Sequence, residues 1–147
     1  MRRGPANAVR PAVITAAAYR VLTGATRSGP GKAYRALGRM KAGRMNRTET
    51  RYAAVLEARR ASGEVFWWAF QAIKLRLADN THLTPDFAVL PSTGVFEFHD
   101  TKGAKHLIEE DANAKMKIAG EVYPFRFFFA WPSKAGVGGF EVVEVGG

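Results

Sequence analysis

Hydrophobic residues recur at two different spacings along the chain, and each spacing predicts a different kind of element. Residues 47–61 consist mostly of good helix formers, and Tyr52 and Leu56 recur at helical spacing. Asn46 followed by Glu49 is typical of a helix N-cap with a capping acid. We therefore expect a helix over residues 47–61, which the following Ser-Gly pair ends.

Apolar runs between residues 65 and 102 predict strands. The first run is dense in aromatic residues, and in the second Ile and Leu alternate with Lys74 and Arg76. Asp79-Asn80 and the segment 91–94 have the composition of turns. The expected strands are 65–70, 73–77, 83–90 and 95–102.

The last third of the chain predicts one more helix and two more strands. Residues 107–122 carry a helical stripe of apolar positions: Ile108, Ala112, Met116 and Ala119. The very apolar run 125–131 predicts an interior strand, and the alternating run 140–145 predicts an edge strand. The order α-β-β-β-β-α-β-β predicts an α/β domain with a central mixed sheet flanked by helices.

The positive charge of the chain is concentrated in its first third. Residues 1–45 carry ten of the 22 Lys and Arg residues and no acid, whereas residues 46–147 carry all 13 acids. We expect residues 1–45 to be a basic, largely disordered arm, with at most a weak helix over residues 12–22, and residues 46–147 to be the folded domain. The arm favours a polyanionic partner such as nucleic acid. A solvated tail without a partner, or a true start at Met40 or Met45, stays open.

Composition excludes several classes of protein. A chain of 147 residues has the length of one domain. Its lack of Cys excludes disulfides, thiolate zinc sites, iron–sulfur clusters and a cysteine nucleophile. No run of 18 apolar residues is present, so we expect no membrane-spanning helix.

Acidic and basic residues gather on two neighbouring predicted strands. Asp100 and Lys102 share a strand face because side chains alternate, and they follow two Phe residues on that face. Pro85-Asp86 lies inside the preceding predicted strand, so Asp86 and Asp100 are expected to meet. Two close carboxylates repel each other unless a proton or cation intervenes, and oxygen ligands suit Mg²⁺ or Mn²⁺. The alternative is an ordinary ion pair between Asp100 and Lys102.

Glu49 adds a third acid on the face of the first helix that also carries Tyr52 and Leu56. An acid on a buried helix face needs a partner, which a metal pocket would supply. The alternative is that Glu49 only closes the capping box of its helix.

The order of a helix with an acid, a strand with Pro85-Asp86, a strand with Asp100-Thr101-Lys102, a helix and a strand resembles the PD-(D/E)XK nuclease superfamily. The surrounding residues are similar to small phage- and prophage-encoded members: Tyr52, Gly63-Glu64-Val65, Gln71 and Thr84 to Phe87. The resemblance covers about residues 46–131 and implies a restriction-endonuclease-like core. Many members have Glu at the position of Asp100, and the pattern allows either acid.

The resemblance also implies roles for individual residues. Asp86 and Asp100 would bind Mg²⁺, with Mn²⁺ as a substitute, together with the main-chain carbonyl of Thr101. Glu49 would help directly or through water, and Lys102 would position or polarise the attacking water. The reaction would be metal-assisted hydrolysis of a phosphodiester bond.

Four further residues are candidate substrate ligands. Gln71 follows the aromatic strand, and Lys74 and Arg76 share one strand face that could follow a phosphate backbone. Lys115 could face a phosphate, although an ion pair with Asp111 one helical turn away is the simpler interpretation. His99 is expected on the face opposite Asp100, and the Trp and Phe residues of 67–70 and 127–129 are expected in the core.

The expected function is that of a Mg²⁺-dependent endodeoxyribonuclease selective for branched or junction DNA, as in the Holliday-junction resolvases of the superfamily. Its role would be in phage recombination or replication, within the cytoplasm of a bacterial host. A non-catalytic basic nucleic-acid-binding protein on a nuclease-like scaffold is the alternative. The apolar segments 127–129 and 140–145 would serve either a homodimer or the core. RNA in place of DNA, and one or two metal ions, stay open.

Overall fold

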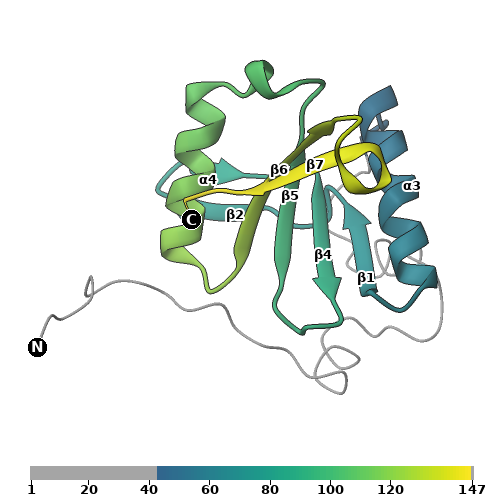
Figure 1. Ribbon diagram of the computed structural model, residues 1–147. Coiled ribbons are helices and arrows are strands. Elements are labelled where there is room, and N and C mark those ends of the chain that lie inside the picture. Colours follow the sequence, from purple (N-terminus) through teal and green to yellow (C-terminus); the bar gives the residue numbers. More distant parts are fainter. Residues whose placement is uncertain (1–42, 147) are drawn as a thin grey trace, which may run out of the picture.

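The computed structural model describes residues 43–146 (Figure 1). The expected basic arm, with its weak helix over residues 12–22, lies outside the described residues except for residues 43–45. The elements in chain order are α3 (Arg47–Ala61), β1 (Val65–Phe70), β2 (Leu75–Ala78), β3 (Thr81–Leu83), β4 (Phe87–Pro91), β5 (Glu97–Thr101), the 3₁₀ turn η1 (Lys105–Leu107), α4 (Glu110–Val122), β6 (Arg126–Pro132), the 3₁₀ turn η2 (Val137–Gly139) and β7 (Phe140–Glu144).

Five strands form one mixed sheet in the order β1-β4-β5-β6-β7, and β2 pairs with β3 in a separate hairpin. Strands β5 and β6 run parallel, with α4 as their crossover, and the other neighbours in the sheet are antiparallel. This confirms the expected α/β domain with a mixed sheet flanked by helices. The expected interior position of β6 and edge position of β7 are also confirmed.

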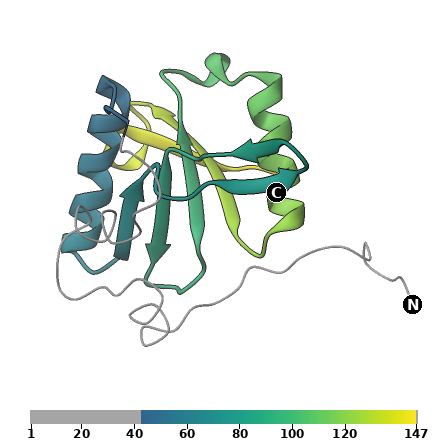
Figure 2. The same ribbon diagram turned by 180° about the vertical axis from the view of Figure 1, so that it is seen from behind.

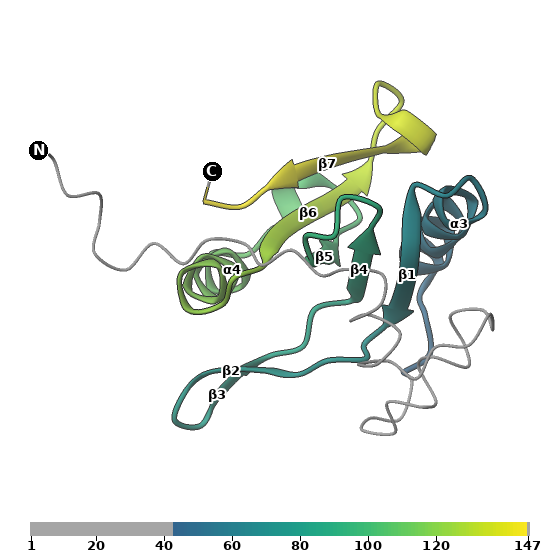
Figure 3. The same cartoon turned by 90° about the horizontal axis from the view of Figure 1, so that it is seen from below.

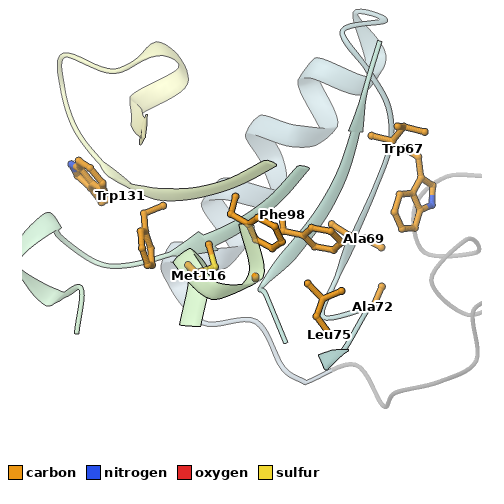
Figure 4. Packing of buried hydrophobic residues seen from close by; sticks show 12 residues of the cluster. Trp67, Ala69, Ala72, Leu75, Phe98, Met116 and Trp131 are labelled. Carbon is orange, nitrogen blue, oxygen red and sulfur yellow. The ribbon is translucent and has the colours of Figure 1, made fainter. Parts of the chain in front are cut away.

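Each face of the sheet carries its own buried cluster. On one face, Tyr52 and Leu56 of α3 belong to the same buried cluster as Phe87 of β4. Met116 of α4 and Leu75 of the hairpin cover the other face, where Figure 4 shows Met116 near Phe98 of β5. Viewed from behind and from below, the β2–β3 hairpin runs across the strands towards α4, whereas α3 packs beside β1 (Figures 2 and 3). The aromatic residues expected in the core are buried, with Phe128 only partly so.

Two expected elements differ substantially from the structure, and the expected strand 73–77 is shifted to Leu75–Ala78. The expected strand 83–90 is divided into β3 and β4, and Pro85-Asp86 lies between them rather than inside a strand. Pro85 lacks the N–H that a sheet ladder requires, so pairing stops there. The expected helix 107–122 begins at Glu110 because Ile108 has an extended backbone, with ψ of 110°, while its side chain packs on the core.

The first helix forms as expected. The Asn46 side-chain oxygen accepts a hydrogen bond from the backbone N–H of Glu49 at 2.8 Å. In return, the Glu49 carboxylate accepts one from the backbone N–H of Asn46 at 2.7 Å. This reciprocal capping box fixes the start of α3. Within residues 43–146, neither helix has the length and apolar character needed to cross a membrane.

Candidate metal centre at the ends of strands β4 and β5

Three strand ends and one helix start meet at the same edge of the sheet (Figure 1). The β1–β4 register pairs Phe70 with Phe87, so Gln71, which follows the end of β1, lies next to Asp86, which immediately precedes the start of β4. The β4–β5 register pairs Phe87 with His99, which places Asp86 next to Asp100. The structure therefore brings together the carboxylates that the sequence predicted as neighbours.

Asp86 is held by two hydrogen bonds from the neighbouring strand. Its Oδ2 atom accepts from the Thr101 backbone N–H and from the Thr101 hydroxyl, each at 2.9 Å. Thr101 thus orients Asp86 through its backbone N–H and its hydroxyl. From the sequence, only the main-chain carbonyl of Thr101 was expected to contribute, as a metal ligand. These two hydrogen bonds hold the Asp86 side chain although the residue lies outside the strand ladder.

Asp100 and Lys102 lie on one face of the β5 end, as the alternation of side chains predicted. The Lys102 Nζ and Asp100 Oδ2 atoms are 3.0 Å apart, and the two side chains are 29% and 13% exposed. An ion pair this sheltered is screened less than a surface pair. The pair supplies one positive charge at a site with two carboxylates.

The electrostatics of the site are dominated by a surplus of negative charge. Burial and the neighbouring Asp100 carboxylate raise the pKa of Asp86 to about 7, against the lowering effect of its Thr101 hydrogen bonds. Partial burial lowers the pKa of Lys102, but the Asp100, Asp86 and Glu109 carboxylates outweigh it, so the net pKa is raised. Lys102 therefore stays charged, and Asp86 is the group that a proton or a cation would neutralise.

Glu49 closes the capping box of α3, as the alternative interpretation predicted, and its negative charge also acts on the site. Its carboxylate closes the capping box, and its charge is one of the contributions that raise the pKa of Asp86. Within residues 43–146, no group of three or more His, Cys, Asp or Glu side chains is arranged as a metal cage. The donors at hand are the Asp86 and Asp100 carboxylates, a set that suits Mg²⁺, which typically takes one or two carboxylates and keeps waters and substrate phosphates as its other ligands.

The four residues expected to bind substrate lie in different surroundings in the structure. The backbone N–H of Gln71 donates to the backbone carbonyl of Asp86 at 2.7 Å, which places Gln71 at this edge of the sheet, and its backbone has a positive φ of 45°. Lys74 is exposed just before β2 and lies outside the strand on which it was expected. Arg76 forms an ion pair with Asp79 in the hairpin, and Lys115 lies 3.4 Å from Asp111, as the simpler interpretation predicted.

Three cations lie before and at the start of α3, and we call them the arginine strip: Arg44, Arg47 and Arg51. From the sequence, Arg44 was counted with the basic arm, but Arg47 and Arg51 were not singled out. All three are exposed, and none forms an ion pair within residues 43–146, although Arg51 lies over the Phe140 ring at 5.6 Å. Positive charge near a helix N-terminus opposes the helix dipole, so these positions do not favour stability. The spacing of Arg47 and Arg51, one turn apart, was the available signal.

A buried polar cluster lies on the opposite face of β5, where His99 was expected. His99 hydrogen-bonds Tyr52 through Nδ1 and Glu97 through Nε2, the latter at 2.9 Å. Burial lowers the pKa of His99 and raises that of Tyr52, so both are uncharged near neutral pH. No short sequence pattern predicts the contact between Tyr52 and His99, because the two residues are 47 positions apart along the chain.

Comparisons of the chain with protein-family models, with curated proteins and with solved structures found no match.

Proposed function

We propose that the protein is a metal-dependent nuclease with a restriction-endonuclease-like core of the PD-(D/E)XK type. The observation that carries the proposal is the pair of adjacent strand-end carboxylates, one with its pKa raised to about 7, beside Lys102 on the same face. The order of elements around the pair supports it, with a helix and an antiparallel pair before the parallel β5–β6 unit. Catalytic sites are where burial and like charges typically combine to raise the pKa of a carboxylate in this way.

The residues divide the work of phosphodiester hydrolysis. Asp86 and Asp100 would hold Mg²⁺, which supplies an activated water and neutralises charge that develops on the phosphate. Thr101 keeps Asp86 aimed at the site through two hydrogen bonds. Lys102 holds a fixed positive charge beside the carboxylates, where it can stabilise the negative charge that develops in the transition state.

The substrate is proposed to be DNA, in branched or junction form, during phage recombination or replication. The arginine strip supports a polyanionic substrate, because its three cations form no ion pair with another residue of the described range 43–146 and lie on the first turns of α3 and just before them. Gly43, which precedes Arg44, approaches the side chain of Gln71, and the Gln71 backbone N–H donates to the Asp86 carbonyl, so the chain enters the strip from the neighbourhood of the site. A phosphate backbone could therefore extend from the site along the start of α3.

The test is cleavage of labelled linear and branched DNA in Mg²⁺ and in EDTA, with Asp100→Asn in parallel. We expect cleavage only in Mg²⁺ and its loss in the variant, with DNA binding retained. RNA of the same structures would establish whether the sugar matters.

The arginine strip also favours a second candidate, a non-catalytic nucleic-acid-binding protein on the same scaffold. In that case the wild-type chain and Asp100→Asn would bind DNA equally, and neither would cleave it. That result would replace the nuclease proposal.

A further inference from the structure

The polar cluster on the opposite face of β5 has no part in the mechanism above. Tyr52 and His99 are each 1% exposed, and the Glu97 side chain is only 12% exposed. Buried hydrogen bonds of this kind add little net stability compared with apolar side chains of similar shape. A core needs no such cluster merely to close.

The hydrogen bonds of the cluster have a defined direction. A carboxylate only accepts, so the bond to Glu97 places a proton on His99 Nε2. The Nδ1 atom of the neutral ring is then an acceptor, and it receives the Tyr52 hydroxyl proton. Two strand residues and one helix residue are joined in a single chain of donors and acceptors.

The cluster lies directly beneath the three acids of the site. Tyr52 follows Glu49 on α3 by one helical turn, and His99 immediately precedes Asp100 on β5. The Tyr52 ring packs edge-on against Phe87, with centroids 5.3 Å apart, and Phe87 immediately follows Asp86. Asp86 and Asp100 are therefore each adjacent in sequence to a residue that contacts Tyr52, and Glu49 lies one helical turn before Tyr52 itself.

We propose that Tyr52 and His99 are positioning residues, which set the places of Glu49, Asp86 and Asp100 relative to one another. This inference rests on the proposed nuclease function. Apolar packing of α3 on the sheet is non-directional and tolerates small slides of the helix. The Tyr52–His99 hydrogen bond is directional and fixes how far along β5 the start of α3 lies.

The test compares Tyr52→Phe with a matched control, Trp68→Phe. The first variant removes one hydroxyl and keeps the ring that packs on Phe87. The control removes a second side-chain hydrogen bond between α3 and the sheet, from Trp68 Nε1 to Glu57 at 2.9 Å, two turns further along the helix from Glu49. Both are assayed well below their unfolding temperatures.

We expect Tyr52→Phe to lower the cleavage rate constant at saturating DNA by about 10- to 100-fold, as a displaced catalytic group would. The Mn²⁺ concentration for half-maximal rate should rise, and KM for DNA should stay within about twofold, because the substrate contacts remain. Amide hydrogen exchange over residues 47–52 should accelerate. Trp68→Phe should leave all of these values near those of the wild-type chain.

Equal rate losses in the two variants would overturn the inference, and so would unchanged exchange over residues 47–52 in Tyr52→Phe. A different outcome would overturn the proposed function instead. In that outcome the wild-type chain neither binds Mn²⁺ nor cleaves DNA, while Tyr52→Phe still accelerates amide hydrogen exchange over residues 47–52.

Discussion

Replacing Asp86 by Asn is expected to stabilise the domain at pH 8 while it removes the proposed activity. Asn is nearly the same size as Asp, and its carbonyl oxygen can still accept the two Thr101 hydrogen bonds of 2.9 Å. The substitution therefore removes mainly the negative charge that Asp100 and burial oppose. A residue that costs stability in place is what a functional carboxylate predicts.

The raised pKa sets the scale of the effect. The difference between the ordinary value of 3.8 and about 7 corresponds to roughly 4 kcal/mol of folding free energy. Lys102 loses one neighbouring carboxylate in the variant, which offsets part of the gain. We expect a net gain of about 2 kcal/mol at pH 8, or roughly 10 °C in melting temperature for a domain of this size.

The sign of the pH dependence follows from the direction of the shift. Because the folded-state pKa lies above the unfolded value, folding favours the protonated form of Asp86. That contribution is complete below about pH 4 and is lost as the pH rises towards about 7. Asp86→Asn should therefore differ from the wild-type chain at pH 8 and scarcely at pH 4.

Thermal or urea unfolding at the two pH values measures this, with Asp111→Asn as the control for an exposed acid in a helical ion pair. Mn²⁺ at a hundredfold excess over its dissociation constant should stabilise the wild-type chain at pH 8 by about 2.7 kcal/mol and the Asn variant far less. If Asp86→Asn is no more stable than the wild-type chain at pH 8, the repulsion inferred at the site is absent and the reasoning is wrong.

Three further predictions concern the other groups at the site. Glu49→Gln keeps an oxygen that can accept from the backbone N–H of Asn46, so it should leave α3 stable. A fall in the cleavage rate would show a role of Glu49 beyond the capping box, and an unchanged rate would show that the cap is its only role. Lys102→Met should lower the cleavage rate by about 10²- to 10³-fold while Mn²⁺ binding persists, because Asp100 loses a competing cation; lost Mn²⁺ binding in a folded variant would contradict this. Replacing the arginine strip by Gln should weaken DNA binding and reduce the slope of log affinity against log salt by about 2 to 3, whereas Arg59→Gln, which breaks an ion pair with Glu64, should change the slope by less than about 1.

The sequence was most informative where local chemistry decides the structure. Asn46 and Glu49 specify the start of α3 through atoms three residues apart, so the cap could be predicted. Alternation along β5 likewise placed Asp100 with Lys102, and His99 on the other face. The position of Asp86 was predicted beside Asp100 for a partly wrong reason, since it belongs to the segment before β4 rather than to a strand.

Features that depend on distant contacts were less accessible. The Tyr52–His99 hydrogen bond joins residues 47 positions apart, and no short pattern encodes it. Arg76 and Lys115 pair with Asp79 and Asp111, which are near them in sequence. Whether such a cation binds a nearby acid or a phosphate depends on the folded surface around it, which the sequence does not show. Ile108 shows the same limit: the apolar pattern assigned it to the helical stripe, but its backbone is extended and its side chain packs on the core.

The β4–β5 hairpin has a consequence for the order of events during folding. Its strands are joined by a short turn, in which the Gly94 amide donates to the Pro91 carbonyl at 3.0 Å, so the two acids meet in one of the most local pairings of the main sheet. If that hairpin belongs to the folding nucleus, like charges oppose each other already in the transition state. Raising the pH from 4 to 8 would then slow the folding arm of a chevron plot and leave the unfolding arm nearly unchanged. The acids at the site would thus govern how fast the chain reaches its native state.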